Sequence, residues 1–387
     1  MRLKDVCEFI VDCPHSTAKD EGQGYPLIRT PNIGKGRFNL EGVHRVSEDV
    51  YRKRNLRATP QDNDLIFASE APAGNVAIIK NGEKYCLGQR TVLIRPNCEY
   101  VYPDFLTYYL LAPQQQYGLL GMANGATVAH VNLPVIRELE ITLPPIEIQR
   151  RIANILSAYD DLIENNQKQI KLLEEAAQRL YKEWFVDLRF PGHENIKIVD
   201  GVPEGWKKTA LSDIADVVMG QSPKSEFYNQ IGEGLPFHQG VGSYGTRFVK
   251  DETYSTSFTR IAKAGSILFS VRAPVGRLNI TKNKIVIGRG IAALNHKNGL
   301  QSFMFYMLKE RFFKDNLVGN GSIFASISKD ELLNQEFIIP CEDVVVKYDK
   351  VVRNIDDKIA SLDRQIELLT EARDRLLPKL MSGELEV

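Results

Sequence analysis

The sequence lacks several features that would place it in a protein class at once. Its 387 residues contain no apolar run approaching about 18 residues, so we expect no transmembrane helix. The start, MRLKDVCEFIVDC, is too short and too acidic for a signal peptide. Only five cysteines occur, and none forms a CxxC pair, which argues against a disulfide scaffold and a zinc ribbon. We therefore expect reduced thiols, a cytoplasmic protein and no membrane partner.

Signatures of catalysis are also missing. No GxxxxGK[ST], HExxH or GxSxG motif is present, which argues against a P-loop, a zinc protease and a nucleophile elbow. LPPI at Leu143 resembles the (N/D)PP(Y/F) loop of adenine methyltransferases, but leucine replaces the residue that would hold the target amine. GVGSYG, from Gly240 to Gly245, matches GxGxxG without a helix pattern after it, so we interpret it as a turn-rich loop. We predict no catalytic site, no metal site and no cofactor in this chain.

Neither sign of charge is in excess, because 49 lysines and arginines balance 49 aspartates and glutamates. The distribution is uneven. Residues 196–340 carry 18 basic and 13 acidic side chains, whereas segments 146–195 and 341–387 carry 7 against 9 and 8 against 11. Binding to DNA requires positive charge opposite the phosphates. A DNA-binding role for this chain would therefore need help from basic partners.

What the sequence does contain is a long heptad pattern within residues 145–185. Apolar positions there step by four and three residues without a slip, the period that lets one helix pack along another. The seam runs through Ile152, Leu156, Tyr159, Ile163, Asn166, Ile170, Leu173, Ala177, Leu180 and Trp184. A helix of this length, roughly 60 Å at about 1.5 Å per residue, is expected to need a partner. Periodicity alone leaves open a coiled coil that merely dimerises.

The same pattern returns 196 residues later, so the partner lies in the same chain. The second seam runs through Tyr348, Val352, Ile355, Ile359, Leu362, Ile366, Leu369, Arg373, Leu376 and Leu380. Asn166 and Arg373 interrupt the two seams, and buried polar groups at such positions often fix register. Since a whole domain separates the two segments, the geometry favours antiparallel pairing, with the domains at opposite ends of a rod.

The repeat extends to the segments before each helix. LIFASEAPAGNVAIIKN is echoed by SILFSVRAPVGRLNITKN, with Ala71-Pro72 answering Ala273-Pro274. DLIFAS, NVAIIK and TVLIRP predict buried strands, and residues 25–38 predict a strand, a loop and a second strand. DFLTYYLLAPQQQYGLLGM has helical spacing. We predict an α+β chain with a pseudo-twofold repeat: mixed α/β domains at 1–144 and 191–340, and long helices at 145–190 and 341–387.

Basic and polar side chains collect in the loops of both domains. Such groups, interleaved with aromatics, can grip phosphates and read base edges. The alternative is a solvated surface around core aromatics. The candidates for DNA contact are Arg29, Lys35, Arg37, Arg54, Arg90, Asn124 and His130 in the first domain, and Gln239, Tyr244, Arg247, Arg272, Arg277, Arg289, Ser322 and Lys329 in the second.

The chain resembles the DNA-specificity subunits of type I restriction-modification enzymes over essentially its whole length. The resemblance rests on YPLIRTPNI, on DLIFAS with APAGNVA, on LPPIEIQRRIANILSAYDDLIE at the start of the first long helix, and on the repetition of these parts. The second copy departs from it, because IIPCEDVVVKYDKVV lacks the paired proline and the glutamine. Contacts there are expected to differ more than the fold does.

The resemblance implies a division of labour. Each mixed domain would be a target recognition domain that reads one half of a bipartite site in double-stranded DNA. The two long helices would set the spacer and dock two methyltransferase subunits that use S-adenosylmethionine. Restriction and motor subunits driven by ATP and Mg²⁺ would complete the complex. Two other hypotheses stay open on the residues alone: the recognition subunit of another phage-defence complex, and a coiled-coil adaptor without DNA function.

Overall fold

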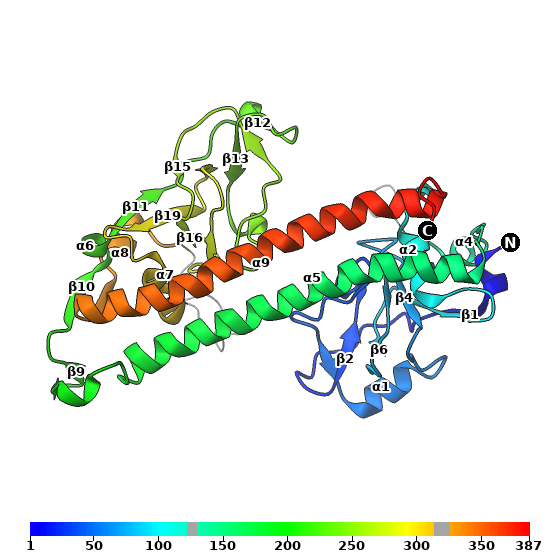
Figure 1. Cartoon of the computed structure of the whole chain (residues 1–387), viewed down its shortest axis with the longest axis horizontal. Helices are drawn as coiled ribbons and strands as arrows, with labels where there is room; N and C mark the ends of the chain where they lie inside the picture. Colours follow the sequence, from blue (N-terminus) through cyan, green and yellow to red (C-terminus); the bar gives the residue numbers. More distant parts are fainter. Residues whose placement is uncertain (122–129, 313–325) are drawn as a thin grey trace. The chain divides into compact units, whose positions relative to one another are not determined.

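The computed structural model describes residues 1–121, 130–312 and 326–387 (Figure 1). The chain forms two compact units, each built from separate stretches of sequence. The first unit comprises Met1–Lys168 and Asp363–Val387, and the second comprises Gln169–Leu362. Each unit therefore contains one mixed α/β domain together with part of each long helix. Among the described residues, no helix is long and apolar enough to cross a membrane.

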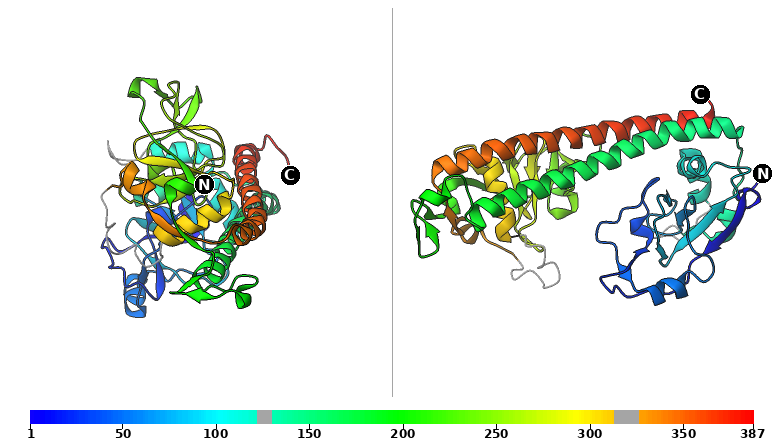
Figure 2. Two further views of the ribbon diagram at one scale, coloured as in Figure 1. Left: turned by 90° about the vertical axis from the view of Figure 1, so that its left-hand side faces the viewer. Right: turned by 60° about the horizontal axis from the view of Figure 1, so that its bottom comes forward.

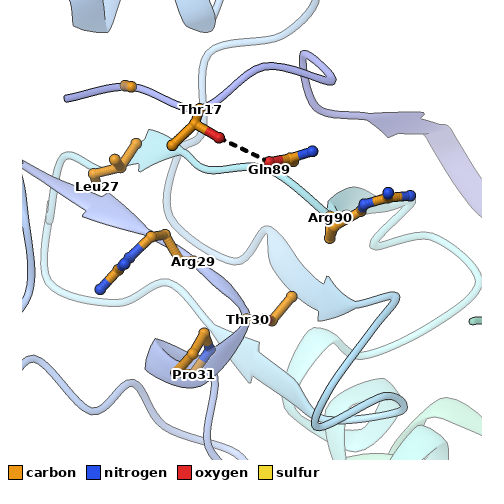
Figure 3. Close-up of a pocket in the computed structure, with 8 residues that line it drawn as sticks. Thr17, Leu27, Arg29, Thr30, Pro31, Gln89 and Arg90 are labelled. Atoms are coloured by element: carbon orange, nitrogen blue, oxygen red, sulfur yellow. Dashed lines mark hydrogen bonds between the residues drawn. The ribbon is translucent and has the colours of Figure 1, made fainter. Parts of the chain in front are cut away.

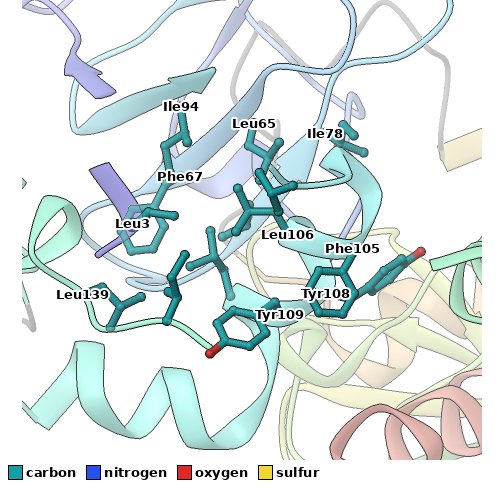
Figure 4. Packing of buried hydrophobic residues seen from close by; sticks show 14 of the residues in the cluster. Leu3, Leu65, Phe67, Ile78, Ile94, Phe105, Leu106, Tyr108, Tyr109 and Leu139 are labelled. Atoms are coloured by element: carbon teal, nitrogen blue, oxygen red, sulfur yellow. The ribbon is translucent and has the colours of Figure 1, made fainter. Parts of the chain in front are cut away.

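A four-stranded antiparallel sheet forms the centre of the first unit, in the order β1 (Cys7–Asp12), β7 (Thr91–Pro96), β4 (Leu65–Ala68), β5 (Val76–Ile78). DLIFAS, NVAIIK and TVLIRP supply β4, β5 and β7, which confirms the three predicted strands. Successive side chains alternate between the faces of the sheet. Leu65 and Phe67 pack under α2 (Pro103–Leu111), whereas Ile66 and Ala68 face a second cluster. Figure 4 shows the first face packed against Phe105 of α2.

A smaller sheet in this unit has the order β3 (Arg45–Val46), β2 (Tyr25–Ile28), β6 (Cys86–Leu87), with β2 parallel to β6. The second strand predicted within residues 25–38 is wrong. After η2 (Thr30–Asn32), Ile33 and Phe38 form only an isolated bridge, because Gly34 N donates to Arg37 O (3.0 Å) and closes a tight turn. The remaining helices are η1 (Leu3–Val6), α1 (Glu48–Arg54), α3 (Pro113–Gly121) and α4 (Leu133–Arg137).

The second unit repeats this topology. Its main sheet has the order β11 (Ala215–Met219), β19 (Ile291–His296), β16 (Ile267–Ser270), β17 (Leu278–Ile280). Its smaller sheet has the order β12 (Tyr228–Asn229), β14 (Tyr254–Ser255), β13 (Leu235–His238), β18 (Ile285–Ile287), β15 (Ile261–Ala262). Here β13 and β18 are parallel, as β2 and β6 are in the first unit. The register repeats too, since Leu65 pairs with Ile94 and Ile267 pairs with Leu294.

Other short elements complete the second unit. They are η4 (His193–Asn195), the hairpin of β8 (Ile198–Val199) and β9 (Val202–Pro203), the pair β10 (Lys207–Ala210) and β20 (Glu336–Ile339), α6 (Leu211–Ile214), η5 (Ser225–Phe227), η6 (Val241–Ser243), α7 (Gln301–Phe312) and α8 (Lys329–Leu333). In each unit one helix covers the main sheet and packs between that sheet and a long helix; this helix is α2 in the first unit and α7 in the second.

The two long helices are α5 (Ile146–Tyr181), which continues as a π-turn over Lys182–Val186, and α9 (Glu342–Ser382). They are packed together and antiparallel, as predicted. In the first unit, Arg373 donates to Asp160, and Asn166 donates to Gln365 Oε1 (3.2 Å). Residue numbers therefore increase along α5 in the direction in which they decrease along α9. The two helices run side by side in Figures 1 and 2.

Every residue of the two heptad seams is buried or half-buried. The most enclosed side chains are Ile152, Leu156 and Ile170 on α5, and Val352, Ile359 and Leu362 on α9. Tyr159, Ile163, Leu173, Leu180, Ile355, Ile366, Leu369 and Leu376 are half-buried. Asn166 is 6% exposed, so the polar interruption of the first seam is an enclosed amide. A continuous stripe of this kind is what long-range packing of two helices requires.

Candidate functional site

A cavity of about 250 Å³ lies in the first unit, where the loop from β6 to β7 passes the end of β2 (Figure 3). We call it the first pocket; it is lined by Thr17, Ala18, Leu27, Arg29, Thr30, Pro31, Gln89 and Arg90. The two loops approach closely at Gly88, whose N–H donates to Ile28 O (2.8 Å). A Cβ at Gly88 would lie 2.3 Å from that oxygen, so only glycine fits there. The contact brings the backbone at Arg29 close to the backbone at Gln89.

The polar side chains of the first pocket are linked to an acidic neighbour. Thr17 Oγ1 donates to Gln89 Oε1 (3.0 Å), as Figure 3 shows. Arg90 Nη1 and His130 Nδ1 both lie 3.1 Å from one oxygen of Glu70. The Nε atom of Arg29 is buried and has no hydrogen-bond partner among the described residues. The first pocket thus offers guanidinium and amide groups to a ligand, with a carboxylate and an imidazole beside it.

The second unit has a cavity of about 150 Å³ at the corresponding place. We call it the second pocket; it is lined by Gln239, Gly240, Val241, Ser270, Arg272, Ala273, Arg289 and Gly290. Its close approach is made by Gly288, whose N–H donates to His238 O (2.8 Å) just as Gly88 donates to Ile28 O. The residue after each of these carbonyls is Arg29 in the first pocket and Gln239 in the second. The two pockets are therefore built on the same backbone plan.

The side chains on that plan differ in charge. Glu70 directly precedes the Ala71-Pro72 motif, and Arg272 directly precedes the matching Ala273-Pro274. A carboxylate accepts hydrogen bonds from base amino groups, whereas a guanidinium donates to the acceptors of guanine. Likewise Gln89 is replaced by Arg289, which follows Gly288. The same backbone plan therefore carries two different sets of hydrogen-bonding groups.

Comparison with known proteins establishes the family of the chain. Residues 1–175 and 203–374 match the family model described as "Type I restriction modification DNA specificity domain". The chain belongs to this family. Two Methanocaldococcus jannaschii proteins, named the MjaX and MjaIX specificity subunits of type I restriction enzymes, are 31% and 28% identical to it. Both matches cover 100% of this chain and 93% of the relative.

A solved structure supports the fold of this specificity subunit. The S subunit of a type I restriction-modification system from M. genitalium is 18% identical, with a TM-score of 0.55. The match covers 98% of this chain and 95% of that chain. It confirms the α+β prediction of two sheet domains with two long, packed helices. Family membership makes the chain a non-catalytic, DNA-binding specificity subunit of a restriction system, as its sequence predicts.

Two predicted DNA contacts of the specificity subunit are buried. Arg54 is 7% exposed and donates to Leu87 O (2.8 Å) and Ser16 Oγ (3.1 Å). Arg247 is 3% exposed and forms an ion pair with Asp356 (2.6 Å). Burial acts to lower the pKa of Arg247, but its polar and acidic neighbours outweigh burial and raise that pKa. Both guanidiniums hold the fold instead of facing solvent.

The other candidates occupy varied positions. Arg37 is half-buried and pairs with Asp161 of α5 (2.8 Å), and burial raises the pKa of Tyr244, whose hydroxyl is enclosed. Arg277 is half-buried, with its backbone N–H donating to Ser270 Oγ (2.8 Å). Lys35 and Lys329 are exposed outside the pockets. Asn124 and Ser322 lie outside the described residues. The pockets thus gather Arg29, Arg90, Gln239, Arg272 and Arg289, with His130 beside the first.

Sequence reasoning missed the carboxylates that lie between each domain and the long helices, Asp160 in the first unit and Asp356 in the second. Asp160 is 3% exposed and accepts from Tyr108 Oη (2.6 Å) and Arg373 Nη1 (2.5 Å). Burial, and next the charge of Asp160, raise the pKa of Tyr108, so its hydroxyl remains a donor. The signal was present as the matching pair YDD and IDD in the two helices.

Among the described residues, no cluster of three or more His, Cys, Asp or Glu could hold a metal ion.

Proposed function

We propose that each pocket reads one half of a bipartite DNA site. The recognition domains are residues 1–144 and 191–340, and the helices 145–190 and 341–387 set the gap between the half-sites. The observation that carries this proposal is the pair of pockets on one backbone plan with different polar groups: Gln89 lines the first where Arg289 lines the second, and Glu70 lies beside the first where Arg272 lines the second. Two half-sites of different sequence need two binding surfaces with different hydrogen-bonding groups. A duplicated domain with altered side chains supplies such surfaces.

The catalytic work is assigned to partner subunits. Two methyltransferase subunits dock on the long helices and bind S-adenosylmethionine, and restriction and motor subunits use ATP and Mg²⁺. The complex acts on cytoplasmic double-stranded DNA. Each methyltransferase flips its target adenine out of the stack, which needs the flanking bases to be held in register. Since this chain carries no net charge, basic partner surfaces supply much of the grip on the phosphates. Alone, the chain is expected to bind DNA weakly and to methylate nothing.

Methylome sequencing of cells that carry this gene and its partner genes tests the proposal. The wild type is expected to return a two-part motif with a fixed gap. Arg29→Ala is expected to relax one half of the motif and Arg272→Ala the other half, because a good bidentate pairing with a base edge is worth about 1–3 kcal/mol of discrimination. Arg52→Ala is the matched control, because Arg52 is exposed on α1 and pairs only with Glu48 among the described residues. A pocket variant that alters both halves, or neither, contradicts the assignment.

A further inference from the structure

Each unit places one carboxylate of a long helix against the domain that it carries, and it is buried in the first unit and half-buried in the second. Asp160 of α5 serves the first unit and Asp356 of α9 the second, and these residues correspond in the internal repeat. Each accepts a hydrogen bond from a tyrosine of the covering helix: Tyr108 of α2 (2.6 Å) or Tyr306 of α7 (3.2 Å). The tyrosine and the carboxylate are thus the same in both units.

The positive charge that balances the carboxylate comes from different places. In the first unit it is Arg373, from the opposite long helix, at 2.5 Å. In the second unit it is Arg247, from a loop of the domain itself, at 2.6 Å. Arg247 also lies 3.6 Å from Glu174 of α5 and 3.7 Å above the ring of Phe305. A buried carboxylate needs such a counter-charge, because desolvation of a lone charge is costly.

Each unit has a small residue at the position that supplies the guanidinium in the other unit. Ile78 N donates to Gly36 O and Ile280 N donates to Arg247 O, so Gly36 is the counterpart of Arg247. A Cβ at Gly36 would lie 2.9 Å from Asp160 Oδ2, and its φ of +92° disfavours other residues. On the helices, Ala177 corresponds to Arg373, and Ala177 is 0% exposed. In each unit, the position that supplies the guanidinium in the other unit therefore carries a residue too small to reach the carboxylate.

We propose that Arg373 and Arg247 are positioning residues: Arg373 locks the first domain onto the two long helices, and Arg247 locks the second. Each domain is matched to its helices by the element that supplies this guanidinium. Gly36 with Arg373 forms one matched set, and Arg247 with Ala177 forms the other. A recognition domain moved to the other position therefore needs its own helix partner. The lock itself does not depend on DNA, whereas its effect on site reading rests on the proposed function.

Relocation of the guanidinium within the second unit tests the matching. In the full chain, Arg247→Ala is expected to lower the melting temperature by roughly 10 °C, because it strands Asp356. Ala177→Arg alone is expected to be destabilising as well, since it brings a second guanidinium into a filled space. The double variant is expected to melt above both single variants. A double variant no more stable than the worse single variant overturns the proposal.

The first unit gives a second test that does not require a new side chain to fit. Arg373→Ala is expected to lower the melting temperature, and Asp160→Asn on top of it is expected to recover at least half of that decrease, because no charge is then left unpaired. Arg375→Ala is the control, since that side chain is 78% exposed on the same helix. A silent Arg373→Ala, or no recovery in the double variant, overturns the role of Arg373. Melting is measured without DNA or partner subunits, so these outcomes are independent of whether the pockets read DNA.

If the lock also orients the domains for reading, the assembled methyltransferase complex reports it. Arg247→Ala is expected to broaden the range of gap lengths that are methylated, and the double variant with Ala177→Arg is expected to narrow it again. A decrease in stability alone would lower the rate at every gap equally. If the double variant regains stability but the range of methylated gap lengths never changes, the guanidinium and its carboxylate only stabilise the fold. That outcome would overturn their role in orienting the domains.

Discussion

At the scale of single residues, Gln149 shows how one buried amide ties the first long helix to the preceding domain. Its Oε1 accepts from Tyr102 N (2.8 Å) at the start of α2, and its Nε2 donates to Pro144 O (2.9 Å). The residue is 1% exposed. The second copy lacks this glutamine, and Asp349 takes over by accepting from Phe303 N (3.0 Å) in α7. The departure noticed in the sequence therefore corresponds to a different side chain making a similar helix-to-helix contact.

Gln149→Leu is expected to destabilise the chain by about 2–4 kcal/mol, because it leaves the buried N–H of Tyr102 and the Pro144 carbonyl without partners. The shape of the side chain is nearly preserved, so altered packing contributes little. Chemical denaturation monitored by circular dichroism measures the change. Glu147→Leu, two residues earlier on an exposed position of the same turn, is the control and is expected to stay within about 0.5 kcal/mol. Equal effects from the two variants would contradict this role for Gln149.

The candidate site could be predicted only in part at this scale. Arg29 and Arg54 both stand in basic stretches with aromatic neighbours, yet one lines a pocket and the other is enclosed. That difference depends on which loops meet in three dimensions, and this cannot be predicted from the spacing of residues in the sequence. Glu70 was overlooked because a lone carboxylate near a proline motif resembles any surface acid. Its meaning appears only when Arg90 and His130 converge on it.

At the scale of elements, the sequence predicted what depends on local periodicity. The heptad seam predicted two long helices, and buried apolar runs predicted β4, β5 and β7. Residues 104–122 were predicted as helical, but proline interrupts the pattern, so α2 ends at Leu111 and α3 begins at Pro113. The parallel pairing of β2 with β6 could not be foreseen, because strands of two to four residues carry too little pattern to identify a partner.

A test of the seam follows from the contrast between two leucines of α5. Leu156 is 0% exposed, whereas Leu162 is 50% exposed on the same helix. Leu156→Ala is expected to destabilise the chain by about 2–5 kcal/mol, because it opens a cavity between helix and domain. Leu162→Ala is expected to change stability by less than about 0.5 kcal/mol. Thermal and urea unfolding measure both variants, and a larger destabilisation from Leu162→Ala would contradict the seam.

At the scale of the whole molecule, the neutral charge and the paired pockets have one explanation. A strongly basic chain would bind any DNA, since phosphate contacts carry no sequence information. Under the proposed function, a neutral chain with two polar pockets would leave affinity to its partners and keep discrimination for itself. The duplicated plan lets Glu70 and Arg272 diverge independently, because each belongs to its own unit. Under the proposed function, such independence would let either half of a recognised site change without disturbing the other.

The proposed role of the helices as a spacer gives the last prediction. Seven residues inserted after Lys168 in α5 and after Leu362 in α9 keep both seams in phase and lengthen the pair by about 10 Å. At about 3.4 Å per base pair, the methylated gap is expected to grow by roughly three base pairs. Three base pairs also turn the duplex by about 100°, so we expect the longer site to be methylated more slowly. The insertion in α5 alone is the control, since it breaks the pairing and is expected to abolish methylation. Methylome sequencing decides the matter: methylation of the original gap at an undiminished rate would mean that the helices do not set the spacing.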